Sequence, residues 1–104
     1  MAKDRPLVVE ALPGAWADIT EGSVFYEEQS PGLGRRFIVE MIAEIQNLAL
    51  YAGTHSQRLE HYFAKADVWP WAIYYLLEGE KVVVTAVMDC RRNPRYIRHR
   101  LNED

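Results

Sequence analysis

The sequence predicts an α+β fold, with one strand, a helical hairpin, three further strands and a short basic C-terminal segment. Two segments with helical spacing of apolar residues flank Ser30-Pro31-Gly32-Leu33-Gly34, whose proline and glycines disfavour one continuous helix. Two later runs, Trp71 to Leu77 and Lys81 to Met88, are rich in β-branched and aromatic residues and indicate strands. These observations favour a helical hairpin that is followed by a sheet.

Length and composition favour one cytoplasmic domain over residues 1–104. Apolar residues make up 49% and charged residues 26% of the chain, which is ordinary for a globular protein. No apolar run approaches the roughly 20 residues that a membrane span needs, and Met1 to Pro6 lack the apolar core of a signal peptide. The single cysteine, Cys90, has no second cysteine for an internal disulfide or a zinc site. We expect no metal, no cofactor and no membrane partner.

Charge is distributed unevenly along the chain. The formal net charge of −3 argues against a general nucleic-acid binder, because affinity for phosphates is built largely from clustered lysines and arginines. Residues 1–30 carry two basic and six acidic groups, whereas residues 89–104 carry five arginines against Asp89, Glu103 and Asp104. A surface that binds anions is therefore expected at the C-terminal end, at Arg91, Arg92, Arg95, Arg98 and Arg100.

The first elements are a strand and a helix. Leu7 to Leu12 form a short β-branched and apolar run, which Pro13-Gly14 is expected to close as a turn. The helical pattern that follows runs to about Gln29, with Trp16, Ile19 and Tyr26 near one face. Asp18 and Glu21 lie near its start, where the helix dipole favours acids. Gly22 either weakens this helix, by about 1 kcal/mol relative to alanine, or marks a close helix–helix approach.

The second helix of the hairpin carries a broad apolar stripe. Its centre consists of Phe37, Met41, Ile45 and Leu48, and Ile38, Ile42 and Ala49 widen it, so we expect this helix to pack on two neighbours. Residues 51–60 show no period and are expected to form a loop.

Three strands and a basic tail complete the predicted fold. His61 to Ala66 is the weakest strand, and Glu78-Gly79-Glu80 joins the last two strands as a hairpin. Both of these strands are apolar on both faces, which places them at the centre of the sheet with a cover on each side. The helical hairpin is one cover, and the other is left open. Asn93-Pro94 predicts the start of a short basic helix.

Three blocks of residues resemble the RelE/ParE plasmid-stabilisation toxins. The first resembles their helical hairpin, in Asp18-Ile19, Glu21, Phe25-Tyr26-Glu27-Glu28-Gln29 and Pro31-Gly32-Leu33-Gly34-Arg35-Arg36-Phe37. The second resembles the family's Phe-Pro-Tyr-x-Ile-x-Tyr strand, in Trp69-Pro70-Trp71-Ala72-Ile73-Tyr74-Tyr75. The third resembles its Val-x-His-x-Arg-Arg-x-Pro ending, in Ala86-Val87 and Arg91-Arg92-Asn93-Pro94. The blocks follow the family's order and span residues 17–100.

The resemblance implies a mostly antiparallel sheet with the hairpin on one face, and a partner antitoxin that wraps the toxin and silences it. Within the family, the RelE-like branch cleaves mRNA on the ribosome, and the ParE-like branch is associated with inhibition of DNA gyrase. The hairpin block favours the ParE-like branch, in which the chain is a non-enzymatic inhibitor. A metal-free ribonuclease and a degenerate copy that has kept only antitoxin binding are the alternatives.

A ribonuclease needs a base for the ribose 2′-hydroxyl, cations for the charged phosphorane and an acid for the leaving oxygen. The candidates are Lys65, Arg91, Arg92 and Tyr96, with His55 and His61 as available bases. The resemblance matches Arg91 and Arg92 to a phosphate-binding arginine and Tyr96 to a C-terminal tyrosine of the RelE-like branch. Asp89 stands where many relatives have histidine, and its carboxylate would either repel a phosphate or hold Arg91 or Arg92 in place.

The candidate residues for binding the antitoxin or the target are Arg91, Arg92, Arg95, Trp71 and Phe37. We expect acidic residues of an antitoxin segment to meet the arginines, while the segment covers the apolar stripe of the second helix and the basic C-terminal surface. The expected assembly is a hetero-oligomer with the antitoxin.

Overall fold

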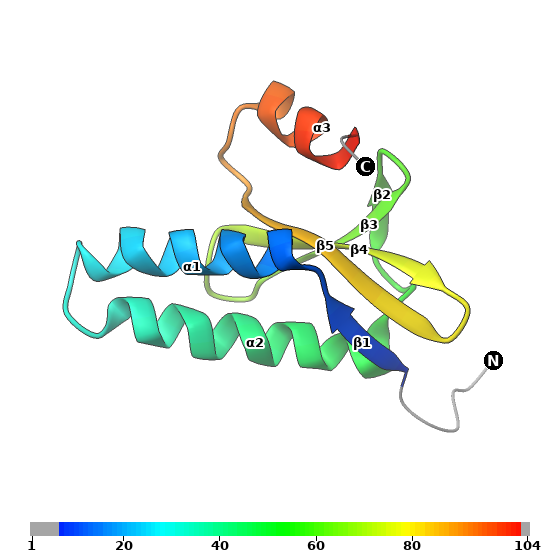
Figure 1. Ribbon diagram of the computed structural model, residues 1–104, viewed down its shortest axis with the longest axis horizontal. Helices are drawn as coiled ribbons and strands as arrows, with labels where there is room; N and C mark the ends of the chain where they lie inside the picture. Colours follow the sequence, from blue (N-terminus) through cyan, green and yellow to red (C-terminus); the bar gives the residue numbers. More distant parts are fainter. Residues whose placement is uncertain (1–6, 103–104) are drawn as a thin grey trace.

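The computed structural model describes residues 7–102; Met1–Pro6, Glu103 and Asp104, on which the expectations about a leader and C-terminal acids rest, lie outside the described residues. The elements, drawn in Figure 1, are β1 (Val8–Ala11), α1 (Pro13–Glu27), α2 (Leu33–Tyr51), β2 (Ser56–Arg58), β3 (His61–Lys65), β4 (Trp71–Glu78), β5 (Lys81–Asp89) and α3 (Pro94–Asn102). None of the helices in the described part of the chain is long and apolar enough to cross a membrane.

The strands form one sheet in the order β1-β5-β4-β3-β2. β1 runs parallel to β5, and the other three pairings are antiparallel. The predicted α+β class and the mostly antiparallel sheet are therefore confirmed. The central positions predicted for β4 and β5 are also confirmed, and each of these strands buries residues on both faces.

Predictions for one turn and one loop are wrong. Pro13-Gly14 does not form a turn, because Pro13 opens α1, where its missing N–H would have had no partner within the helix. The 51–60 segment is not all loop, since Ser56–Arg58 pairs with His61–Phe63 as a three-residue strand. Leu59 and Glu60 join these two strands with φ of 53° and 68°, which is the backbone of a tight hairpin turn.

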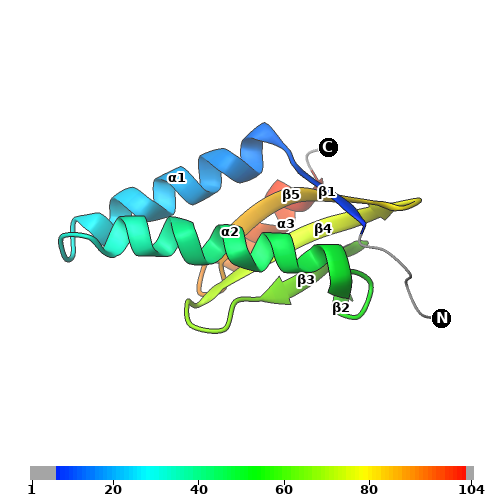
Figure 2. The same ribbon diagram turned by 90° about the horizontal axis from the view of Figure 1, so that it is seen from below.

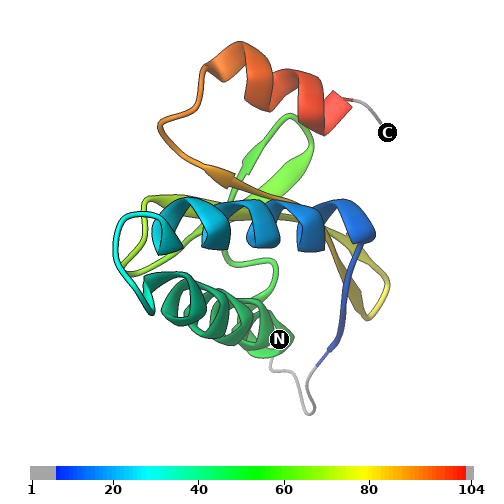
Figure 3. The ribbon, with the colours of Figure 1, turned by 60° about the vertical axis from the view of Figure 1, so that its left-hand side comes forward.

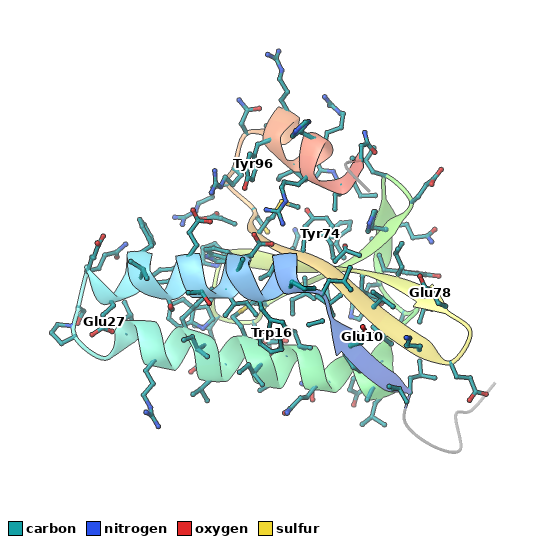
Figure 4. All side chains as sticks on the ribbon, in the orientation of Figure 1. Glu10, Trp16, Glu27, Tyr74, Glu78 and Tyr96 are labelled. Carbon is teal, nitrogen blue, oxygen red and sulfur yellow. The ribbon has the colours of Figure 1, made fainter. Side chains whose placement is uncertain are left out.

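α1 and α2 run side by side as the predicted hairpin and cover one face of the sheet (Figures 1 and 2). The carboxylate of Glu27, labelled at the tip of the hairpin in Figure 4, accepts hydrogen bonds from the backbone N–H groups of Gly32 (3.0 and 3.1 Å) and Gly34 (3.0 Å). Gly32 has a φ of 87°, which glycine adopts without steric cost. Gly34 lies so close to α1 that an added Cβ would be 2.3 Å from the Ser23 carbonyl oxygen.

The stripe of α2 packs inward on two neighbours, as predicted. Phe37, Met41, Ile45 and Leu48 are at most 5% exposed and belong to the main core together with α1 and the sheet. Gly22 of α1 marks a close approach, since an added Cβ would lie 2.7 Å from the Phe37 ring and 2.8 Å from the Trp71 ring. The core face of α2 is thereby filled by the protein itself.

The second cover of the sheet is α3, which the sequence left unassigned. Figure 3 shows α3 on the side of the sheet away from α2. Ile97 and Leu101 of α3 pack on a smaller cluster in the sheet that consists of Ala72, Tyr74, Ala86 and Met88. The predicted start of this helix at Pro94 is confirmed.

Asp18 fastens α3 to the rest of the fold. Its carboxylate accepts two hydrogen bonds from the Arg100 guanidinium, at 2.7 and 2.8 Å, and one from the Val87 backbone N–H, at 2.9 Å. β1 ends opposite Val84, so β5 continues beyond its parallel neighbour and Asp18 supplies the acceptor there. The assignment of Asp18 to the helix dipole is wrong, because α1 starts at Pro13 and has no acid in its first turn.

Candidate functional site

The C-terminal arginines lie on α3 and on the connector, residues 90–93, which joins β5 to α3. The Arg91 guanidinium donates two hydrogen bonds, of 2.9 and 2.7 Å, to the Asp89 carboxylate. The Arg91 backbone N–H donates a third, of 2.8 Å, to the same carboxylate. The hydrogen bonds from Arg91 lower the pKa of the Asp89 carboxyl, and the carboxylate in turn raises the pKa of Arg91. The sequence analysis allowed Asp89 to pair with Arg91 or Arg92, and in the structure it pairs with Arg91. The two charges of this ion pair cancel.

Arg92 and Arg95 offer positive charge to solvent. The Arg92 guanidinium lies 4.1 Å from the centre of the Tyr96 ring, which is cation–π geometry, and both arginines are exposed. The Asn93 side chain accepts a hydrogen bond of 2.7 Å from the Arg95 backbone N–H and caps α3. Neither Arg92 nor Arg95 forms an ion pair within residues 7–102.

The two aromatic candidates are positioned very differently. Phe37 is 0% exposed and packs between Tyr26, Trp69 and Trp71, so its side chain has no surface to offer and the expected binding role is not met in this structure. The other residues at the centre of the stripe, Met41, Ile45 and Leu48, are likewise buried in the core. Trp71 is 8% exposed, and its indole N–H donates a hydrogen bond of 2.9 Å to the Tyr26 hydroxyl.

One edge of Trp71 lines a cavity of about 270 Å³ between α1 and the connector. The other lining residues are Glu21, Gly22, Phe25, Asp89 and Arg92. We call this space the connector cavity. It brings together two of the predicted binding residues, Trp71 and Arg92, with the exposed ring of Phe25, which the sequence analysis did not single out as a binding residue. Its only sequence signal was that it belongs to the hairpin block.

Two of the cations proposed for RNA cleavage, Lys65 and Arg91, act electrostatically on Cys90. Burial raises the pKa of the Cys90 thiol; the charges of Lys65, Arg58 and Arg91 act in the opposite direction, and that of Asp89 adds to the rise. Arg58 was missed because the residues around it were interpreted as a loop. Tyr96 lies on the same side of the sheet as Tyr74 (Figure 4), and its hydroxyl accepts a hydrogen bond of 3.2 Å from Arg100.

The two candidate bases lie away from the arginines of the connector. His55 shares a cavity with Lys65 and contacts the Tyr75 hydroxyl at 2.6 Å, and burial lowers its pKa. His61 lines a different groove, of about 510 Å³, at the C-terminal end of α3, where its Nδ1 donates to the Leu59 carbonyl at 3.0 Å. Neither cavity is lined by Arg91, Arg92 or Tyr96. In the described residues, no group of three or more His, Cys, Asp or Glu side chains could hold a metal ion.

Comparison with solved structures identifies the architecture. No protein-family model matches the sequence, and no curated protein matches it either. A chain from the chromosomal ParDE TA (toxin–antitoxin) system from P. aeruginosa superposes with a TM-score of 0.72 at 12% identity, covering 80% of this chain and 95% of that chain. A chain of the RelBE2 toxin–antitoxin complex from Mycobacterium tuberculosis superposes with a TM-score of 0.57 at 16% identity, covering 86% and 97%. The chain has the RelE/ParE toxin fold.

Within the RelE/ParE fold, the three sequence blocks form the turn of the helical hairpin, part of the core and the connector. The hairpin block supplies Glu27 and Gly32 for the turn and Gly34 for the close contact of the two helices. The aromatic block begins β4 and supplies Trp69 and Trp71 to the core beneath the hairpin. The last block ends β5 and forms the connector and the start of α3. The residues that carry the resemblance therefore have structural roles in this fold.

Proposed function

We propose that this chain is the toxin of a type II toxin–antitoxin system and that a cognate antitoxin neutralises it. The observation that carries the proposal is the superposition over most of the chain on structures from two toxin–antitoxin systems, and the three sequence blocks that resemble such toxins support it. The antitoxin is the partner of a hetero-oligomeric complex.

The antitoxin meets the basic surface formed by the connector and α3. Arg92 and Arg95 are exposed and have no ion-pair partner within residues 7–102, so acidic residues of an antitoxin gain charge-assisted contacts there. Arg91 contributes less than the sequence suggested, because Asp89 already neutralises it. The centre of the apolar stripe of α2, Phe37, Met41, Ile45 and Leu48, takes no part, since it is buried in the core.

The proposed action on the cell is inhibition of DNA gyrase by binding, as in the ParE-like branch. Cleavage of RNA would need a base, an acid and several free cations around one phosphate. Here His55 and His61 line cavities that include neither Arg91 nor Arg92, and Arg91 is paired with the Asp89 carboxylate. The arrangement supports an inhibitor more than a nuclease.

Ribosome-dependent cleavage of mRNA is the second candidate. The observation that favours it is that positive charges from three separate segments, at Lys65, Arg58 and Arg91, all act on Cys90, although burial has the larger effect and raises the pKa of its thiol. A degenerate, non-toxic copy that still binds the antitoxin is the third reading, since the Asp89–Arg91 pair reduces the charge available at the connector.

Controlled expression of the chain alone in a bacterial host tests the proposal. We expect growth arrest with altered plasmid supercoiling and intact transcripts, and relief when the product of an adjacent gene is co-expressed. Arrest with transcripts cut inside codons would replace gyrase with the ribosome as the target. Normal growth, with the intact protein present at a high level, would leave only the degenerate copy.

A further inference from the structure

The connector cavity has an aromatic wall that the fold holds in place. Trp71 is fixed by its hydrogen bond to Tyr26 and by the Phe37 ring, whose centre lies 5.0 Å away. Gly22 lines the cavity and lies close to Trp71. A side chain at this position would collide with the Trp71 ring. Phe25 completes the wall in edge-to-face contact with Tyr26 at 5.1 Å, while 48% of its surface is exposed. Such a rigid aromatic wall is typical of the sites where a partner's anchor side chain binds.

The rim of the cavity carries charges that orient an occupant. Asp89 is neutralised by Arg91, whereas Arg92 stacks on Tyr96 and keeps its charge directed to solvent. Glu21 carries a carboxylate on the opposite, α1 side of the cavity. An acidic partner chain is therefore repelled by Glu21 of α1 and attracted to the connector. Arg95, the second residue of α3, adds exposed positive charge next to the connector.

The size of the cavity selects the kind of occupant. At about 270 Å³, it lies just below the roughly 300–1,000 Å³ that is typical of small-molecule and cofactor sites. It accommodates one large side chain of a protein partner, with the flanking residues of that partner lying over the rim.

We propose that the connector cavity receives a single aromatic or branched aliphatic side chain from an acidic segment of the antitoxin, whose neighbouring carboxylates bind Arg92 and Arg95. This inference rests on the proposed function and specifies where its partner is anchored. It places the centre of the interface between α1 and the connector, at Phe25 and Trp71, and away from the core face of α2.

The test compares two substitutions on adjacent residues of α1. Val24 and Phe25 are 53% and 48% exposed, but only Phe25 lines the cavity. The antitoxin that relieves growth arrest is purified and titrated calorimetrically into the full chain and into its Phe25→Asp and Val24→Asp variants. We expect Phe25→Asp to weaken binding roughly 30-fold, as expected for a hot-spot residue, and Val24→Asp to change it by less than about 3-fold. Circular dichroism confirms that both variants fold.

A second pair of variants tests the charges. Ile97 faces the sheet, so at 100° per residue Arg98 points to the side of α3 opposite to Tyr96 and Arg100, away from the cavity. Arg92→Ala should weaken binding roughly 10-fold and flatten its dependence on salt, whereas Arg98→Ala should do neither.

The outcomes separate the inference from the function on which it rests. Equal affinity of Phe25→Asp and the wild type, or equal losses for Phe25→Asp and Val24→Asp, would overturn the cavity as the anchor while the proposed function stands. Failure of any adjacent gene product to bind the wild-type chain would overturn the proposed function and the inference together. A photo-crosslinker at position 25 should react with an apolar antitoxin residue that has Asp or Glu within four positions.

Discussion

At the scale of single residues, Asp18 shows how one buried carboxylate can organise three elements. It lies on α1, binds Arg100 of α3 through both oxygens, and accepts the Val87 N–H of β5. The Asp18 and Arg100 side chains are only 9% and 22% exposed. Removing one partner of such a pair leaves the other charge without compensation, which costs far more than loss of a surface ion pair.

Asp18→Asn is therefore expected to lower the free energy of unfolding by about 3 kcal/mol, measured by urea denaturation. Glu10→Gln is the matched control, because it removes the same kind of charge from the Glu10–Lys81 pair, whose side chains are 50% and 46% exposed. That variant should lose less than about 1 kcal/mol. Equal losses for the two variants would show that Asp18 does not hold α3 in place.

His55 makes the stability of the fold depend on pH. The Tyr75 hydroxyl accepts the Gly53 N–H at 2.8 Å and shares a hydrogen bond of 2.6 Å with Nδ1 of His55. Burial lowers the pKa of His55 in the folded state below the usual value of about 6.5. As the pH falls, the unfolded chain therefore binds this proton first, and the contribution of His55 to stability is lost.

The free energy of unfolding should thus fall as the pH is lowered from about 6.5 through the folded-state pKa of His55, and the His55→Gln variant should lose less over the same range. Denaturation curves at several pH values measure this difference. An NMR titration that placed the pKa of the folded His55 ring at or above the ordinary value would contradict the prediction.

At the scale of elements, the hairpin is shaped by its glycines as much as by its apolar stripes. Gly34 brings α2 against the α1 backbone, and the Glu27 carboxylate closes the turn between them. A methyl group at Gly34 would collide with a backbone carbonyl, which cannot move aside as a flexible side chain can.

Gly34→Ala should lower the free energy of unfolding by about 2–3 kcal/mol, as expected for overpacking. Gly14→Ala is the matched control on α1, because nothing lies within 4 Å of the added Cβ. That variant should keep its stability or gain up to about 1 kcal/mol from the better helix propensity of alanine. Thermal melts and urea curves distinguish the two; a harmless Gly34→Ala would show that the helices are not held this closely.

The elements could largely be predicted from sequence, because their signals are local. Apolar periodicity in α2 and β-branched residues in β5 act over a few neighbouring positions. β2 could not be predicted, since its three exposed residues show no period and its turn uses Leu59 and Glu60 in place of the Asn-Gly that usually indicates such a hairpin. Pro13 was misassigned because proline begins helices as readily as it forms turns.

At the scale of the whole molecule, one sheet separates two surfaces with different roles. The hairpin fills one face with the main core, and α3 covers part of the other face; the C-terminal arginines lie on α3 and on the connector. The sequence located the basic surface correctly within the chain, but it could not show that Asp89 engages Arg91 or that Phe37 lies inside. An apolar stripe has the same spacing whether it faces a core or a partner, so only the tertiary structure decides between them.

Inhibition of gyrase by the purified chain tests the central claim most directly. Negative supercoiling of relaxed plasmid by purified bacterial DNA gyrase is followed as the chain is added, with and without an excess of its antitoxin. We expect loss of supercoiling that depends on the dose of the chain and is reversed by the antitoxin. Undiminished gyrase activity, together with cleavage of mRNA on purified ribosomes by the same preparation, would contradict it and identify the chain as a nuclease.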